Sequence, residues 1–433
     1  MHVPLLELTA QNRPLEAELN AAFARVLRSG QYILGPELDS FEHQVAALTH
    51  TRHAIGVSSG TDAILLALMT LGVGPGDEVL CPSFTFFATA GCVARVGARP
   101  VFVDSCPVCF NLDVADAARK VTPWTKAIIP VHLFGQAAEM DGVLALAHAH
   151  GLAVIEDAAQ ALGAGYRGRK VGGLGTMGVF SFFPTKNLGG FGDSGMLVTH
   201  DDRLADKARL LRVHGARARY YHQFIGANFR MDPLQAALLS VKLPHYDAYT
   251  SRRRENAAYY TDRLSKFPNV VLAAITESRC LSCGTADRGT QTVQHGTKHA
   301  EHARRNTEHA RPDASPAAES QISDSKSQIR LVLPSAYPHN DPIWNQYTLR
   351  VPGEGRRDAL KAWLARKGIG SETYYPVPLH RQECFAYLGG AADALPNANL
   401  LASQCLSIPI YPELTRAQRD EVVDAIREFL EQV

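Results

Sequence analysis

Short apolar runs of strand length alternate along this chain with longer segments of helical periodicity. Six runs are expected to be strands, at residues 78–81, 100–104, 127–131, 153–157, 179–182 and 195–199. Helical patterns lie between them, as near 61–72 and 140–150. Strands that alternate with helices build wound, mainly parallel sheets. The pattern therefore predicts an α/β fold whose ligands bind beyond the carboxyl ends of the strands.

A second, smaller α/β unit is expected after the helical stretch at 233–243. Its elements are a helix near 250–266, strands at about 269–273 and 346–351, and helices near 356–367 and 415–432. Thr415 is placed to cap the last helix. We therefore divide the chain into a large domain, residues 1–245, and a small C-terminal domain, residues 246–433.

Residues 275–328 interrupt the small domain with a polar stretch that has almost no aromatic or large aliphatic side chains. Such a composition cannot offset the entropy of ordering, so a mobile surface insertion is expected. Within it, Cys280, Cys283, His295 and His299 have nearly the spacing of a zinc finger. Few apolar residues lie between them to cover a metal, so we favour chance and predict no metal.

Composition and charge are those of an ordinary globular enzyme. The chain has 433 residues, 46% of them hydrophobic, and its 44 Lys and Arg balance 43 Asp and Glu. No attraction to nucleic acid or to an anionic membrane is implied. Because no basic leader with an apolar core and no long apolar span is present, we expect a cytoplasmic protein. The eight cysteines do not suggest a disulfide scaffold, and Cys81 and Cys92 lie in runs that resemble strands.

Candidate chemistry centres on the sequence SFFPTKNLG at 181–189, which presents Lys186 in a Gly-flanked turn. A lysine of this kind can form a Schiff base with pyridoxal phosphate, and Asp157, in IEDAAQ at 155–160, could hold the pyridine nitrogen protonated. Upstream, SGTD at 59–62 opens a helix whose free N–H groups could bind the cofactor phosphate. Taken alone, the SGTD segment would more often be an ordinary helix N-cap than a phosphate-binding site. The order of these features along the chain, first SGTD, then Asp157 and then Lys186, favours the cofactor site.

The chain resembles the sugar aminotransferases of the DegT/DnrJ/EryC1/StrS family, which have pyridoxal phosphate fold type I. That fold combines a large, mainly parallel sheet domain with a smaller C-terminal α/β domain. The resemblance runs nearly end to end and breaks only at the insertion. Its motifs, beyond those above, are QYILGPE at 31–37, PSFTF at 82–86, FVD at 102–104, NFRMDPLQA at 228–236 and YPVPLH at 375–380.

The resemblance implies roles for individual residues. Lys186 would carry the cofactor and act as base and acid, and Asp157 would pair with the pyridinium nitrogen. The other cofactor contacts would be Gly60, Thr61, Phe86, Gln160, Ser181 and Asn228. Because the family sends the Asn228 side chain across from a neighbouring subunit, a homodimer with shared active sites is implied. The substrate would be held by Gln31, Tyr32, Tyr375 and His380.

The function that the resemblance implies is amino transfer of the ping-pong type. An amino acid, by family habit glutamate, would supply the amine to a keto carbon of a UDP- or dTDP-linked hexose, and QYILGPE favours the 3-keto position. The product would serve polysaccharide or glycosylated-metabolite synthesis. Two alternatives stay open. One is a non-catalytic pyridoxal phosphate-binding regulator, and the other is a different fold type I enzyme that would hold an α-carboxylate through Arg230 or Arg350.

Overall fold

The computed structural model of the chain describes residues 2–273 and 330–432. Its largest sheet has seven strands in the order β1-β9-β8-β5-β4-β2-β3. Neighbours from β8 to β3 pair in parallel, whereas β9 is antiparallel to both β8 and β1. The expected α/β fold with a mainly parallel sheet is confirmed. The strands are β1 (His53–Val57), β2 (Glu78–Pro82), β3 (Arg99–Val103), β4 (Thr125–Ile128), β5 (Ala153–Asp157), β8 (Met177–Ser181) and β9 (Gly195–Thr199).

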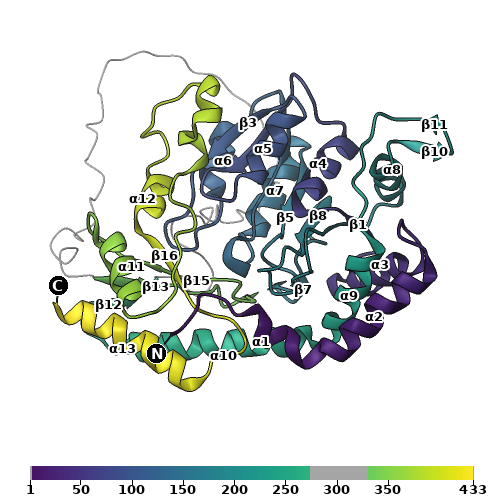
Figure 1. Cartoon of the computed structure of the whole chain (residues 1–433). Helices are drawn as coiled ribbons and strands as arrows, with labels where there is room; N and C mark the ends of the chain where they lie inside the picture. Colours follow the sequence, from purple (N-terminus) through teal and green to yellow (C-terminus); the bar gives the residue numbers. More distant parts are fainter. Residues whose placement is uncertain (1, 274–329, 433) are drawn as a thin grey trace, which may run out of the picture.

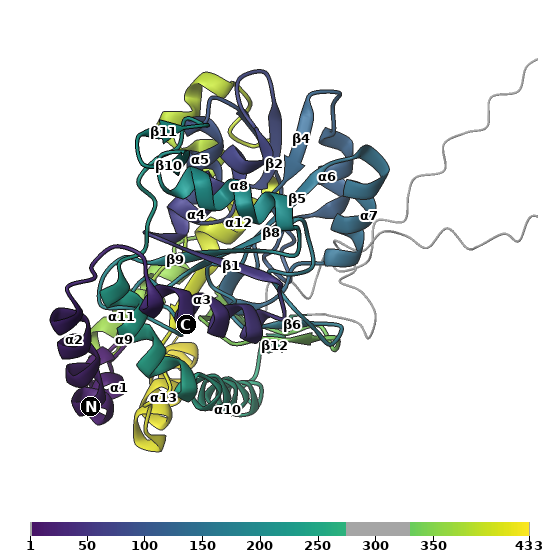
Figure 2. The same cartoon turned by 90° about the vertical axis from the view of Figure 1, so that its right-hand side faces the viewer.

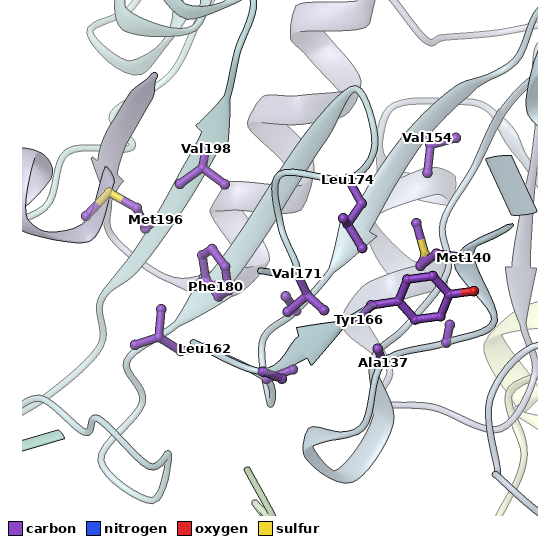
Figure 3. Close-up of a cluster of buried hydrophobic side chains, with 14 of the residues drawn as sticks. Ala137, Met140, Val154, Leu162, Tyr166, Val171, Leu174, Phe180, Met196 and Val198 are labelled. Carbon is purple, nitrogen blue, oxygen red and sulfur yellow. The ribbon is translucent and has the colours of Figure 1, made fainter. Parts of the chain in front are cut away.

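Helices cover both faces of this sheet (Figures 1 and 2). One core packs the strands against α3 (Pro36–Thr49), α6 (Val114–Lys120) and α7 (Met140–His150). The other packs them against α4 (Gly60–Leu71), α5 (Ala88–Arg95) and α8 (Asp202–Arg212). Successive strand side chains point to opposite faces, so Met196 and Val198 enter the first core and Leu197 the second. Figure 3 shows part of the first core, where Met196 and Val198 lie beside Phe180.

A smaller sheet of four strands, β12-β13-β15-β16, has its own core. Its helices α10 and α13 run along the base of the molecule in Figure 1. Val3 forms a parallel bridge with Ile369 and is buried in this second core. The boundary at residue 245 stays a prediction. The elements are β12 (Val270–Leu272), β13 (Leu331–Leu333), β15 (Tyr347–Arg350), β16 (Cys405–Ile408), α10 (Tyr246–Leu264), α11 (Arg356–Arg366) and α13 (Arg416–Gln432).

The remaining elements connect or flank the two sheets. Helix α9 packs against both α2 and α3. Strand β14, from the C-terminal part of the chain, pairs with β6 in a separate three-stranded sheet, β14-β6-β7. These elements are α1 (Leu8–Asn12), α2 (Glu16–Ser29), α9 (Pro233–Lys242), α12 (Pro396–Gln404), β6 (Gly165–Tyr166), β7 (Arg169–Lys170), β10 (Ala216–Ala218), β11 (Tyr221–His222) and β14 (Asn340–Asp341).

A buried ion pair joins α3 to α8. Arg212 Nη1 lies 2.5 Å from Glu42 Oε1, with 9% and 11% of the two side chains exposed. The same two groups bond the backbone of Gly56 in β1, since Glu42 accepts from its N–H and Arg212 donates to its carbonyl. Both charges are thus neutralised and hydrogen-bonded, as charges removed from water must be.

The expected strands and helices lie within a few residues of their predicted positions. Thr415 does cap α13, because its Oγ1 accepts from the Gln418 N–H at 3.2 Å. The prediction that Cys92 lies in a strand was wrong. Cys92 lies in helix α5, whose apolar side chains pack in the second core. The 275–328 stretch and the four candidate zinc ligands lie outside the described residues. Within the described ranges, no helix has the length and apolar character needed to cross a membrane.

Candidate active site

A cavity of about 480 Å³ opens beyond the carboxyl ends of β5 and β8. It is lined by the start of α4, by the loop after β8 and by residues of the C-terminal part. The β8–β9 connection explains why the loop lies here. Because β8 and β9 are antiparallel neighbours, the segment between them turns back at one edge of the sheet instead of crossing it.

Lys186 lies in that loop and lines the cavity. The loop is tightly folded, since the Lys186 N–H donates to the Phe183 carbonyl at 2.8 Å and the Gly190 N–H to the Phe182 carbonyl at 2.7 Å. A Cβ at Gly189 would lie 2.1 Å from the Pro184 carbonyl oxygen, so only glycine fits. Burial lowers the pKa of Lys186 to about 8, against a smaller raising effect of the Asp157 carboxylate. A lysine with so low a pKa is a nucleophile near neutral pH.

Asp157 ends β5 and lines the same cavity with only 5% of its surface exposed. Burial raises the pKa of this carboxyl group, while the Thr89 hydroxyl, the Ala159 N–H and the charge of Lys186 lower it. Thr89 Oγ1 donates to Asp157 Oδ2 at 2.8 Å, and the Ala159 N–H donates to Oδ1 at 3.2 Å. Both carboxylate oxygens are therefore held in place, with acceptor capacity left for a cationic N–H donor.

The start of α4 forms one part of the cavity wall. Ser59 is the N-cap, accepting from the Asp62 N–H at 3.0 Å, and Gly60, Thr61 and Ser181 line the wall beside it. A Cβ at Gly60 would lie 2.8 Å from the Ser181 Cβ, so glycine is required for this approach. Free N–H groups of a helix start and nearby hydroxyl groups suit a phosphate. The helix-cap alternative is thus also correct, because Ser59 both caps α4 and lines the cavity.

Aromatic and amide side chains also line the cavity. Gln160 accepts from the Phe134 N–H at 2.8 Å and donates to the Tyr375 hydroxyl at 3.0 Å. Phe86 lines the cavity and is 56% exposed, with its ring centre 6.1 Å from that of Tyr375. An exposed aromatic face at this position can stack on a planar ring.

Four predicted site residues are not among those lining the cavity. Asn228 is exposed, on the extended segment that bridges to Val213. Gln31 and Tyr32 are exposed beyond the end of α2. His380 is held in the fold: its Nδ1 is 2.7 Å from Ser83 Oγ and its Nε2 is 3.1 Å from the Ala392 carbonyl oxygen.

Several cavity residues were missed from the sequence. Thr85, Asp193, Gln346 and Tyr374 line the cavity, and Thr89 orients Asp157 from α5. Gln346 and Tyr374 come from the C-terminal part, which no local motif connects to Lys186. Thr89 lies one helical turn after the PSFTF motif, and this spacing was the signal available for it.

Three further observations bear on the alternatives. Among the described residues that line the cavity there is no arginine; Arg350 instead donates to the Pro107 carbonyl, and Arg230 is absent from the lining. Within residues 2–273 and 330–432, no group of three His, Cys, Asp or Glu side chains is arranged to hold a metal. In the same ranges, Cys81, Cys92, Cys384 and Cys405 are free thiols.

The sequence profile of the DegT/DnrJ/EryC1/StrS aminotransferase family matches residues 14–298 and 316–427. The chain therefore belongs to this family. The residues left unmatched between the two ranges, 299–315, lie within the polar stretch at 275–328, and the extent of that insertion stays a prediction.

Individual relatives span the full length. A pleiotropic regulatory protein of Geobacillus stearothermophilus is 43% identical, over 99% of both chains. A dTDP-3-amino-3,4,6-trideoxy-alpha-D-glucose transaminase of Streptomyces venezuelae is 40% identical, over 100% of this chain and 97% of the relative. Among solved structures, S. venezuelae DesV in complex with a ketimine intermediate has a TM-score of 0.83 at 40% identity, covering 100% of this chain and 99% of that one.

Proposed function

We propose that the protein transfers an amino group from an amino acid, glutamate by family habit, to the keto carbon of a UDP- or dTDP-linked hexose, with pyridoxal phosphate as cofactor. The observation that carries the proposal is the pairing of Lys186 and Asp157 in one cavity beside a helix start. Family membership and the sugar transaminase from S. venezuelae support the substrate class. The amino position in that relative's name favours C3 of the sugar.

The cavity residues fit pyridoxal phosphate. Lys186 would hold it covalently, Asp157 would pair with the ring nitrogen, and Gly60, Thr61 and Ser181 would bind the phosphate. When bound, this cofactor supplies a cationic ring that accepts an electron pair from the substrate carbon. The buried Asp157 carboxylate, bonded by Thr89, would keep a proton on the ring nitrogen. Lys186 Nζ, once freed by the substrate amine, would accept the proton of the substrate carbon and deliver it to the cofactor's C4′ atom.

Phe86 would stack on the cofactor ring, and Gln160 would contact its ring oxygen. Tyr375, whose hydroxyl group bonds Gln160, would form the wall on which the sugar packs. Gln31, Tyr32 and His380 remain proposed substrate contacts. His380 also contacts Ser83 and the Ala392 carbonyl through its two ring nitrogens, which holds its side chain in the loop that follows Tyr375.

The proposed working unit is a homodimer in which Asn228 completes the partner's site. The exposure of Asn228, away from the cavity of its own chain, supports this. Mixing inactive Lys186→Ala and Asn228→Ala chains tests it. Each mixed dimer would hold one intact site, so about a quarter of wild-type activity should return after subunit exchange. Activity that stays at the level of the separate variants would contradict shared sites.

The amino transfer itself is tested by incubating the protein and pyridoxal phosphate with glutamate and a panel of keto sugar nucleotides, with plain keto acids as the comparison. An aminated sugar nucleotide, detected by mass spectrometry, is the expected product. Turnover of keto acids alone would instead favour another fold type I enzyme.

A second candidate is a pyridoxal phosphate-binding regulator without turnover, because the G. stearothermophilus relative carries a regulatory name. Conversion of the bound cofactor to its amine form by glutamate alone would exclude this candidate. We further propose a cytoplasmic location, no nucleic-acid or membrane partner, and a division near residue 245 into two domains. The near-zero net charge supports the absence of a nucleic-acid partner.

A further inference from the structure

A buried lysine outside the cavity contacts the loop that carries Lys186. Lys242 is the last residue of α9 and is only 1% exposed. Its Nζ donates to the Gly189 carbonyl at 2.5 Å and lies 5.5 Å from the centre of the Phe191 ring. Gly189 and Phe191 both follow Lys186 closely in the loop, so Lys242 contacts the same short segment that presents the reacting amine.

The same loop is held by other side chains around it. Gln235 lies about two helical turns before Lys242, on the same side of α9. Its Oε1 accepts from the Phe191 N–H at 2.9 Å. Asn187 Nδ2, next to Lys186, donates to the Ile343 carbonyl at 3.0 Å. The loop backbone is therefore bonded to α9 and to the C-terminal part of the chain, while Lys186 faces the cavity.

The burial of the Lys242 ammonium group costs free energy, and no ion pair among the described residues offsets that cost. Removing an ammonium group from water is unfavourable, and replacing a buried charge with an apolar side chain of similar volume is often neutral or stabilising. Burial lowers the pKa of Lys242 to about 8, with Glu413 as a smaller opposing influence. The ion pairs found among the described residues include none formed by Lys242. Its close polar contact is the loop carbonyl of Gly189.

We propose that Lys242 is a positioning residue for Lys186, fixing the loop through the Gly189 carbonyl so that the Lys186 amine is presented to the cofactor. The proposal rests on the proposed role of Lys186. A misplacement of a reacting group by about 1 Å can cost on the order of a hundredfold in rate. Loss of the Lys242 bond should therefore affect the chemical step more than stability or substrate affinity.

The test compares Lys242→Met with Lys170→Met. Lys170 is a matched control, because it also donates to a glycine carbonyl, that of Gly163 at 2.8 Å, but in another loop. In the Lys242 variant, kcat and the rate of pyridoxal phosphate attachment to the cofactor-free protein should each fall about tenfold or more. The KM for glutamate and the melting temperature should stay near wild type. Lys242→Arg, which keeps a buried donor, should recover much of the lost rate.

Near-wild-type kcat and attachment rate in Lys242→Met would overturn the proposal, as would an equal loss in Lys170→Met. If Lys242→Met does not fold, Gln235→Leu is measured in the same assays, where a slower attachment at unchanged KM supports loop positioning and an unchanged rate overturns it. A wild-type protein that attaches no pyridoxal phosphate would overturn the proposed function itself. Attachment by wild type with an unaffected variant would overturn the Lys242 proposal alone.

Discussion

Lys186 should react with pyridoxal phosphate at a much lower pH than an ordinary lysine does. Only the neutral amine attacks the cofactor aldehyde, so the pKa sets the reactive fraction. Burial lowers the pKa of Lys186 from 10.5 to about 8. At pH 7.5 about a quarter of the amine groups are then neutral, against about one in a thousand at the ordinary lysine pKa. The attachment rate of the cofactor-free protein should rise with pH and level off above about 8.

The Asp157→Asn variant tests the influence that opposes burial at Lys186. The Asp157 carboxylate raises the pKa of Lys186, so its loss should lower that pKa further and shift the pH midpoint of attachment downward. Asp193→Asn is the control, because Asp193 also lines the cavity but is not among the groups that shift the pKa of Lys186. The assay mixes cofactor-free protein with pyridoxal phosphate over a pH series and follows the visible absorbance in a stopped-flow instrument.

This reasoning would be refuted if the pH midpoint of cofactor attachment in the wild-type protein were close to the pKa of an exposed lysine. An upward shift in Asp157→Asn would also refute it, since the sign of the carboxylate's effect would then be wrong. A downward shift of similar size in the Asp193 control would show that the polarity of the cavity in general, and not the Asp157 carboxylate in particular, opposes the effect of burial on the pKa of Lys186.

Three further substitutions follow from single contacts. Thr89→Val removes the hydrogen bond to Asp157 Oδ2 and should lower kcat about tenfold in a steady-state assay, because a bond to a charged group is worth about 1.5–3 kcal/mol; unchanged kcat would contradict the role of Thr89. Glu42→Gln breaks the buried ion pair of α3 and α8 and should reduce the free energy of unfolding by about 3–5 kcal/mol in urea. Gly60→Ala introduces a Cβ 2.8 Å from that of Ser181 and should weaken the Kd for pyridoxal phosphate about tenfold, measured by fluorescence titration.

The strand pattern could be predicted from the sequence because each inner strand is an apolar run buried on both faces, as β5 and β8 are. Strand β1, with the run HAIGV, was not predicted. The antiparallel direction of β9 was not predicted either, since a buried run such as Gly195–Thr199 has the same pattern whichever way it pairs.

The candidate site, like the fold, could be predicted from the sequence only in part. Lys186, Asp157 and Gly60 lie in local motifs at the ends of strands and helices, and the structure brings them into one cavity. Gln346 and Tyr374 reach that cavity only through tertiary packing, which no spacing along the chain specifies. Asn228, Gln31 and Tyr32 do not line the cavity of their own chain, so the roles proposed for them require a second copy or a bound substrate.

The central claim is that Lys186 holds pyridoxal phosphate covalently beside Asp157, and one measurement tests it most directly. The protein is incubated with pyridoxal phosphate, reduced with borohydride, digested and analysed by mass spectrometry, with Lys186→Ala treated in parallel. The account predicts a phosphopyridoxyl group on the peptide that contains Lys186, and no stoichiometric label in the variant. Labelling of a different lysine, or no stoichiometric label in the wild-type protein, would contradict it.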